Sequence, residues 1–183
     1  MDSVNYFQSS HSFREGNQRR LVTSNDLKGW CDLMAKLLER HLNNPGRLNL
    51  SVAQSSYDTW LDGYRVGVPG RKGSIYVEGA VLAFLCDTRI MERTGGQASL
   101  STAMRLLWER YGKPRTGLTA DMYWDILAEV AGERLDDLRQ DHAEGTADTW
   151  LPLVHAFATQ GLALSQHVDD AGLTRVTIAP ASA

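Results

Sequence analysis

The residues of this sequence with the most chemical potential are its five histidines. Two histidines one helical turn apart, with a glutamate beside the first, form the H-E-x-x-H pattern, which binds zinc and activates a zinc-bound water. No pair falls at that spacing among the histidines present, which are His11, His41, His142, His155 and His167. The sequence therefore predicts no zinc site of this kind.

One histidine fits part of another zinc pattern. His142-Ala143-Glu144 has the H-x-E arrangement of a zinc deaminase, in which the glutamate moves protons for the metal-bound water. That chemistry also needs a P-C-x-x-C segment downstream, and none follows. We therefore interpret these residues as the solvated side of a helix. The sequence also shows no recognisable Ser-His-Asp or Cys-His catalytic set, although sequence alone does not locate such triads.

The composition and charge argue against a nucleic-acid-binding or membrane-spanning protein. A formal net charge of −3 gives no basic footprint for nucleic acid or for an anionic membrane surface. No apolar run approaches the roughly 20 residues of a membrane-spanning helix. The two cysteines, Cys31 and Cys86, form no C-x-x-C pair and are expected to be buried, reduced thiols. The first residues lack a signal-peptide pattern, so a cytoplasmic setting is the default expectation.

Most elements that must position these residues are expected to be helices. Helical spacing of apolar residues predicts helices at about 24–42, 51–60, 75–93, 99–111, 119–131, 134–142 and 151–160. The helix over 75–93 is apolar on every face in its middle, which predicts burial all round. Among the residues expected to point inward are Met104, Trp108 and Met122.

After Gly161 the apolar period changes to two. Leu162 and Leu164 precede a turn, and Val176 and Ile178 follow it, which predicts a β-hairpin. The expected fold is mainly α, with six or seven helices packed around the helix over 75–93 and a short hairpin at the C-terminal end. Residues 1–20 are polar and aperiodic, as is typical of a disordered arm.

Several segments, in this order, resemble the glycyl aminopeptidase family of zinc metallopeptidases. Each segment is short, and the ordered series is what makes the resemblance specific. The segments are Leu42-Asn43-Asn44-Pro45-Gly46-Arg47, Ser55-Ser56-Tyr57-Asp58-Thr59-Trp60, Tyr76-Val77-Glu78-Gly79-Ala80-Val81-Leu82-Ala83-Phe84-Leu85-Cys86-Asp87, Arg93-Thr94-Gly95-Gly96 and Met104-Arg105-Leu106-Leu107-Trp108-Glu109-Arg110-Tyr111-Gly112.

The resemblance implies a domain organisation. In that family the catalytic domain is thermolysin-like, and its helical half follows a zinc-binding half. Residues 21–161 resemble the helical lobe, and residues 162–183 resemble the run into a PDZ-like domain. The chain thus resembles an internal slice of a larger protein, either a fragment or a truncated paralogue.

The resemblance also implies roles for two residues. Tyr76 matches the tyrosine of the Tyr-x-Lys-Gly segment of related aminopeptidases, whose phenol donates a hydrogen bond to the developing oxyanion. Glu78 replaces the lysine of that segment. The alternative is a partly buried tyrosine at the start of a helix. Glu15 resembles the third zinc-ligand segment, but the aromatic run expected after Gly16 is missing, so a solvated glutamate is the better interpretation.

Two functions follow from these expectations. The first is a piece of a zinc aminopeptidase that releases small N-terminal residues from peptides, inactive alone because H-E-x-x-H is absent. The alternative is a non-enzymatic helical module that binds a peptide or a protein. Because the zinc-binding lobe is missing, Val81, Phe84 and Leu85 are expected to lie on an uncovered apolar face. Such a face is expected to be covered by a second copy, by a partner such as the missing zinc-binding lobe, or by residues 1–20 folded over it. A homodimer is the favoured cover.

Overall fold

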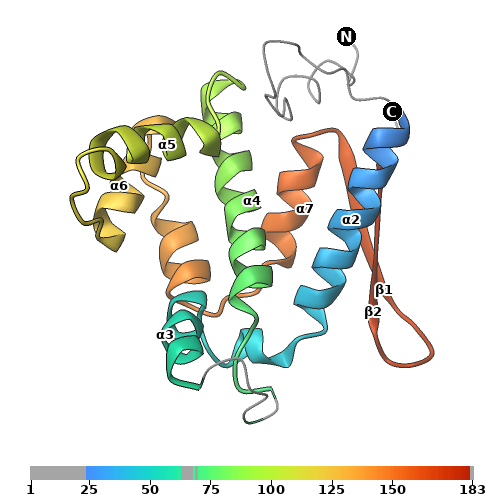
Figure 1. Cartoon of the computed structure of the whole chain (residues 1–183). Helices are drawn as coiled ribbons and strands as arrows, with labels where there is room; N and C mark the ends of the chain where they lie inside the picture. Colours follow the sequence, from blue (N-terminus) through green and yellow to red (C-terminus); the bar gives the residue numbers. More distant parts are fainter. Residues whose placement is uncertain (1–23, 63–67, 69, 182–183) are drawn as a thin grey trace.

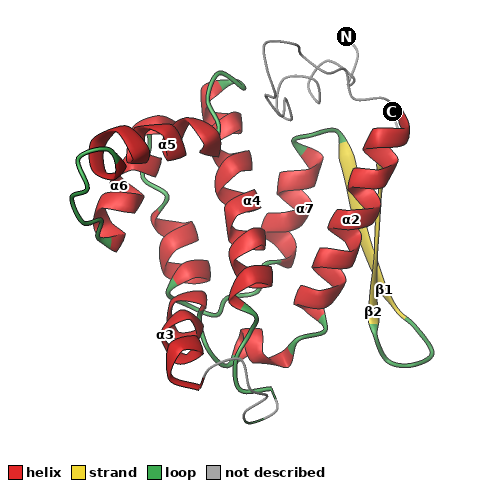
Figure 2. Cartoon of the chain, viewed as in Figure 1, coloured by secondary structure: helices red, strands yellow, loops and turns green. Residues whose placement is uncertain are grey.

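The computed structural model describes residues 24–62, 68 and 70–181. This part of the chain is mainly helical (Figure 2), as predicted, and none of its helices has the length and apolar character needed to cross a membrane. The α-helices are α2 Ser24–Leu42, α3 Val52–Asp62, α4 Ile75–Thr94, α5 Leu100–Leu107, α6 Ala120–Ala131 and α7 Trp150–Ala158. Shorter 3-10 and π segments and two strands complete the order: η1 Pro45–Leu48, η2 Trp108–Gly112, η3 Leu138–Ala143, β1 Leu162–Val168 and β2 Thr174–Pro180.

Local hydrogen bonds set where several helices begin and end. Before α3, the Ser51 hydroxyl accepts the Gln54 N–H at 3.1 Å, and the Gln54 side chain accepts the Ser51 N–H at 3.0 Å. This reciprocal pair is a capping box. Thr119 caps α6 through its hydroxyl. Helices α4 and α6 end at Gly95 and Gly132, whose φ angles of 60° and 75° favour glycine.

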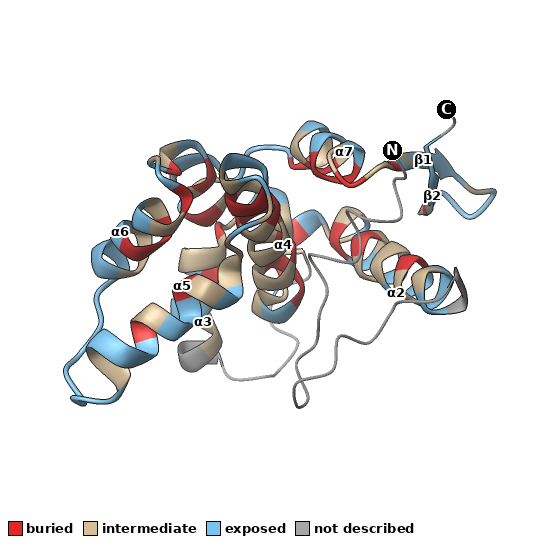
Figure 3. Cartoon of the chain, turned by 90° about the horizontal axis from the view of Figure 1, so that it is seen from above, coloured by how far each residue is buried: buried red, intermediate tan, exposed pale blue. Residues whose placement is uncertain are grey.

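Helix α4 forms the centre of the bundle. Figure 1 shows it between α2 and α7 on one side and α5 and α6 on the other. Val81 is 2% and Leu85 4% exposed, and Phe84 is half-buried. Figure 3 shows buried segments along α4. The expectation that these residues lie on an uncovered apolar face is therefore wrong. The other elements of the chain cover them, so they give no reason for self-association.

Three aromatic side chains join the helices on one side of α4. Phe84 of α4 and Phe157 of α7 have ring centroids 4.9 Å apart. Trp30 of α2 lies 6.3 Å from the first ring and 6.1 Å from the second. Aromatic pairs at these separations contribute about 0.5–1.5 kcal/mol beyond the area that they bury. The cluster therefore ties the first and last helices of the bundle to the central one.

Three residues expected to point inward are instead at the surface. Trp108 is 60%, Met104 40% and Met122 38% exposed. At Trp108 the ladder changes from α to π, and the Lys113 N–H donates to the Trp108 carbonyl at 2.8 Å. The Trp108 N–H still donates within the α ladder, to the Met104 and Arg105 carbonyls, so Trp108 lies on the same exposed face as Met104 one turn earlier. Its indole packs on Gly112, where an added Cβ would fall 2.3 Å from a ring carbon. Periodicity predicts a face, whereas packing decides whether neighbours cover it.

The predicted hairpin forms beside α2. Strands β1 and β2 pair antiparallel, with Leu162 opposite Pro180 and Val168 opposite Thr174. At its tip, Asp169 accepts the N–H groups of Ala171 and Leu173, each at 2.9 Å, and the guanidinium of Arg175 at 2.7 Å.

These donors stabilise the turn in a pH-dependent way. The Leu173 N–H, then Arg175 and then the Ala171 N–H hold the pKa of Asp169 below its usual value. Their contribution to stability is therefore present at neutral pH and is lost as the pH falls through that lowered pKa.

The core supplies a testable prediction about Cys86, which is 1% exposed. Burial raises the pKa of its thiol to about 12. In a Cys31→Ser variant at pH 8, the Cys86 thiol should resist a thiol reagent in the native state and react fully in denaturant. An unfolded thiol ionises from about pH 8.5, so the free energy of unfolding should decrease as the pH rises from there toward 12.

The control for the pH dependence is a Cys31→Ser, Cys86→Ala variant, in which the decrease above pH 8.5 should be smaller. Rapid native labelling of Cys86 would show that the helices around α4 open readily, contrary to the burial described above.

Candidate functional site

Tyr76, the sequence-predicted catalytic residue, lies in the first turn of α4. Its side chain is 68% exposed. The structure therefore does not match the alternative of a partly buried tyrosine, and the phenol is accessible, as the oxyanion role requires. The role itself stays a prediction. Glu15, the residue similar to a third zinc ligand, lies outside the described residues.

Two residues after Tyr76, Glu78 is buried and joins a hydrogen-bonded network. Its Oε2 atom lies 2.6 Å from His41 Nδ1, and His41 Nε2 lies 2.6 Å from the Thr149 hydroxyl. His41, Glu78 and Thr149 are 2%, 7% and 7% exposed. A carboxylate only accepts, so Nδ1 donates to Glu78. A neutral imidazole then accepts the hydrogen of the Thr149 hydroxyl at Nε2.

Three separate elements bring this network together. His41 comes from the last turn of α2, Glu78 from the first turn of α4, and Thr149 directly precedes α7. Two glycines allow loops to pack close by. A Cβ at Gly46 would fall 2.2 Å from the Lys72 carbonyl oxygen, and one at Gly73 would fall 2.9 Å from Glu78 Cγ. Any larger residue at Gly46 would therefore move the loop that precedes α4.

A small polar cavity adjoins the network. Its volume is about 30 Å³, which is room for about one or two water molecules. Three of its polar atoms, Glu78 Oε1, Arg47 Nε and His142 Nδ1, are buried without a hydrogen-bond partner among the described residues. An acceptor and a donor that face one cavity can both be satisfied by a small polar molecule. An amino acid does not fit.

The order carboxylate, imidazole, hydroxyl in this network is also that of a hydrolase triad. In such a triad the hydroxyl attacks a carbonyl carbon, so it must be open to the substrate. The Thr149 side chain is buried, and the adjoining cavity is far smaller than an acyl substrate. The network therefore acts structurally: it satisfies a buried carboxylate and joins α2 to α4 and α7.

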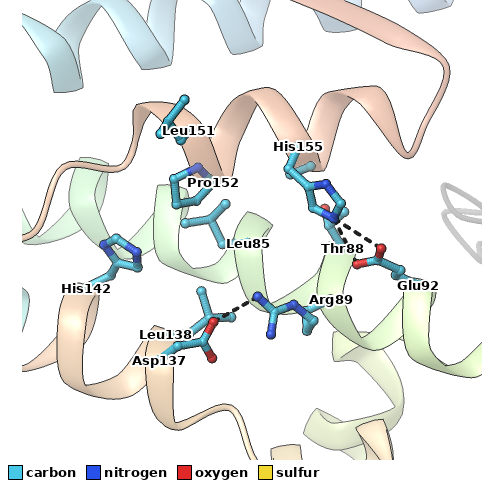
Figure 4. Close-up of a pocket in the computed structure, with 11 residues that line it drawn as sticks. Leu85, Thr88, Arg89, Glu92, Asp137, Leu138, His142, Leu151, Pro152 and His155 are labelled. Atoms are coloured by element: carbon cyan, nitrogen blue, oxygen red, sulfur yellow. Dashed lines mark hydrogen bonds and ion pairs between the residues drawn. The ribbon is translucent and has the colours of Figure 1, made fainter.

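A larger cavity of about 230 Å³ runs along α4, between η3 and α7 (Figure 4). Its charged groups are already paired with each other. Arg89 donates to Asp137 at 2.9 Å, and His155 lies 3.1 Å from Glu92. Its apolar lining consists of Leu85, Leu138, Leu151, Pro152 and Ala156. His142 lines both cavities, and its Nδ1 atom has no hydrogen-bond partner among the described residues. The acidic and basic groups of the larger cavity are paired with each other, so it offers little to a charged ligand.

The described residues do not fit a zinc ion. Nowhere in this part of the chain do three or more His, Cys, Asp or Glu side chains form a group that could hold a metal. Zinc sites in proteins need three or four such donors. The buried pair His41 and Glu78 supplies two donors, and both already bind each other.

Sequence reasoning named Tyr76 but not His41 or Thr149. A signal was available, because Glu78 is a charged residue at the start of a helix that was predicted to be buried. A buried carboxylate requires a partner. The sequence does not reveal the partners, because the network joins residues far apart in the chain: Thr149 lies 108 positions from His41.

The network can be tested through stability. Replacing His41 by alanine leaves the Glu78 carboxylate buried without a partner, and the free energy of unfolding should fall by about 3–5 kcal/mol. A Leu33→Ala variant, at a residue that is 68% exposed, is the surface control and should stay within about 0.5 kcal/mol of the unmodified chain. Urea denaturation measures both. A variant with His41→Leu and Glu78→Leu together should lose less than the sum of the single changes, and additive losses would contradict the direct contact.

Comparisons with known proteins agree with this fold. The model of the M61 glycyl aminopeptidase family matches residues 9–82. A crystal structure of an aminopeptidase N family protein from Idiomarina loihiensis is similar, with a TM-score of 0.70 and 23% identity. The similarity covers 81% of this chain and 26% of that one. No curated protein matches significantly. Residues 9–82 are thus similar to the M61 glycyl aminopeptidase family, and the chain shares its fold with part of an aminopeptidase N family protein.

Proposed function

We propose that this chain is the helical lobe of a glycyl-aminopeptidase-like catalytic unit. It forms one wall of a peptide-binding cleft and presents Tyr76 to a zinc-binding part that residues 1–183 do not supply. The substrate is a peptide with a small N-terminal residue, and zinc belongs to the other part of the unit. The observation that carries this proposal is the accessible side chain of Tyr76, which is 68% exposed in the first turn of a helix that packs at the centre of the bundle.

The position of Tyr76 supports an electrostatic role. A phenol in the first turn of a helix lies beside the positive end of the helix dipole, where negative charge is stabilised. Attack on a peptide carbonyl develops negative charge on its oxygen, and a phenol O–H can donate a hydrogen bond to that oxygen. Helix α4 holds the backbone of Tyr76 firmly, because Val77, Glu78 and Val81 just beyond it are buried.

The local electrostatics differ from those of the lysine-containing segment that the sequence resembles. Glu78 stands in place of that lysine, and its side chain points into the bundle toward His41. No lysine ammonium therefore lies at this position to support an oxyanion. In the complete unit, the oxyanion is stabilised by Tyr76, by the N-terminal end of α4 and by the metal.

Zinc would supply the activated water and polarise the peptide carbonyl in the complete unit. Neither the sequence, which lacks H-E-x-x-H, nor the donor set of the described residues fits the metal. Activity therefore requires the other lobe. We infer that the isolated chain binds peptide poorly and hydrolyses none.

This proposal predicts the behaviour of the purified chain. After dialysis against zinc, metal analysis should find less than one zinc per chain, and a glycyl anilide should not be hydrolysed. One tightly held zinc per chain together with hydrolysis would refute the division into two lobes. An active glycyl aminopeptidase, treated in parallel, serves as the positive control for both measurements.

A complementation experiment tests the role of Tyr76. Joining the zinc-binding half of a glycyl aminopeptidase to this chain should give measurable hydrolysis of a glycyl anilide. A Tyr76→Phe change in the hybrid should then lower kcat by about 10²-fold with little change in KM, because the phenol acts in the transition state. An equal rate for both hybrids would exclude Tyr76 as an oxyanion donor.

A further inference from the structure

Among the described residues, the edge of the hairpin along β1 pairs with no other strand. In an antiparallel pair, opposed residues alternate between hydrogen-bonded and non-bonded positions. The Asp169 N–H donates to the Leu173 carbonyl, and at the other end the Ala181 N–H donates to the Gly161 carbonyl, both at 2.9 Å. The backbone groups of the odd-numbered residues of β1 therefore bond to β2. Those of the even-numbered residues point away from the hairpin, among them Leu164, Gln166 and Val168.

The opposite edge, along β2, is covered by helix α2 at Thr174 and Val176. Asn43 accepts the Thr174 N–H at 2.8 Å and donates to the Thr174 carbonyl at 2.8 Å. One helical turn earlier, Glu39 accepts the Val176 N–H at 3.1 Å. Two side chains at i and i+4 thus replace a neighbouring strand. Figure 1 shows α2 running beside the hairpin, which stands at the margin of the bundle.

The β1 edge has no comparable cover in the described part of the chain. No hydrogen bond from these residues reaches the outward backbone groups of Leu164, Gln166 or Val168. Natural edge strands are commonly protected by lysine or glutamate, by proline or by a bulge. Strand β1, Leu-Ala-Leu-Ser-Gln-His-Val, has none of these over its seven residues. An open and uncharged edge of this length is suited to pairing with another strand.

We propose that this edge pairs with β1 of a second copy of the chain, antiparallel and about a two-fold axis at Gln166. Pairing centred there places the outward backbone groups of Leu164 opposite those of Val168 in the other copy, and the reverse. The two Gln166 residues meet at the axis. The result is a four-stranded sheet that spans the dimer, with helix α2 of each copy covering part of its outer edge.

The side chains along β1 are self-complementary in this register. Leu164 meets Val168 of the second copy, and the Val168 side chain is 68% exposed in the single chain. On the other face Ser165 meets His167, a hydroxyl beside an imidazole. No like charges oppose each other, because β1 contains no Asp, Glu, Lys or Arg. An isologous contact of this kind needs only one patch, and both copies already present it.

The test is a charge placed at the two-fold axis. Gln166→Lys would bring two ammonium groups together and should weaken dimerisation at least tenfold, measured by light scattering or sedimentation over a dilution series. The matched control is Thr177→Lys, on the exposed face of β2 opposite Ser165. It adds the same charge one strand away from the new contact. That separation is about a Debye length at physiological salt, so the dissociation constant of the dimer should change by no more than about threefold.

Amide hydrogen exchange gives an independent reading. The Leu164, Gln166 and Val168 amides should exchange more slowly as the protein concentration rises, whereas the Thr177 amide, already bonded within the hairpin, should be slow throughout. A chain that stays monomeric up to millimolar concentration would overturn the proposal. So would a dimer that Gln166→Lys leaves intact. Protection of the three amides at every concentration would also overturn it, because another part of the same chain would then cover the edge.

Discussion

The arrangement of this bundle depends on a carboxylate that folding removes from water. Glu78 lies in the first turn of α4, and an ionised carboxylate that is buried without partners costs several kcal/mol. His41 satisfies it from the end of α2, and Thr149 holds the imidazole from the start of α7. One requirement of local electrostatics thus draws the ends of three helices to one place, while Trp30, Phe84 and Phe157 join the same helices along their length.

This anchoring also accounts for the contrast between Tyr76 and its neighbours. The side chains that follow Tyr76 face the core and hold the start of α4, whereas the phenol faces outward. A group that must meet a developing charge works best when its backbone cannot move. A rigid helical lobe is therefore suited to orient one donor, which is the role that we propose for Tyr76.

The two edges of the hairpin differ in how their outward backbone groups are satisfied. Glu39 and Asn43 of α2 satisfy the outward N–H groups of Thr174 and Val176, so α2 covers this part of the β2 edge. Strand β1 has open backbone groups, no charge and an exposed valine at its end. The difference matters because the unpaired backbone groups of an unprotected edge can bind another strand. An interface at β1 would leave Tyr76, at the start of α4, in its own environment on the bundle.

The sequence by itself determined the helices, their caps and the hairpin, because periodicity and capping are local properties. Helix α4 was placed within a residue or two, and Thr119 and Gly132 were identified as the ends of α6. The resemblance singled out Tyr76 from one short segment. Tertiary structure decided what local patterns cannot carry: that Val81 and Leu85 are covered by the chain's own helices, and that the face with Met104 and Trp108 lies at the surface. It also decided which histidine meets Glu78, because such contacts join residues far apart in the chain and depend on how whole helices pack.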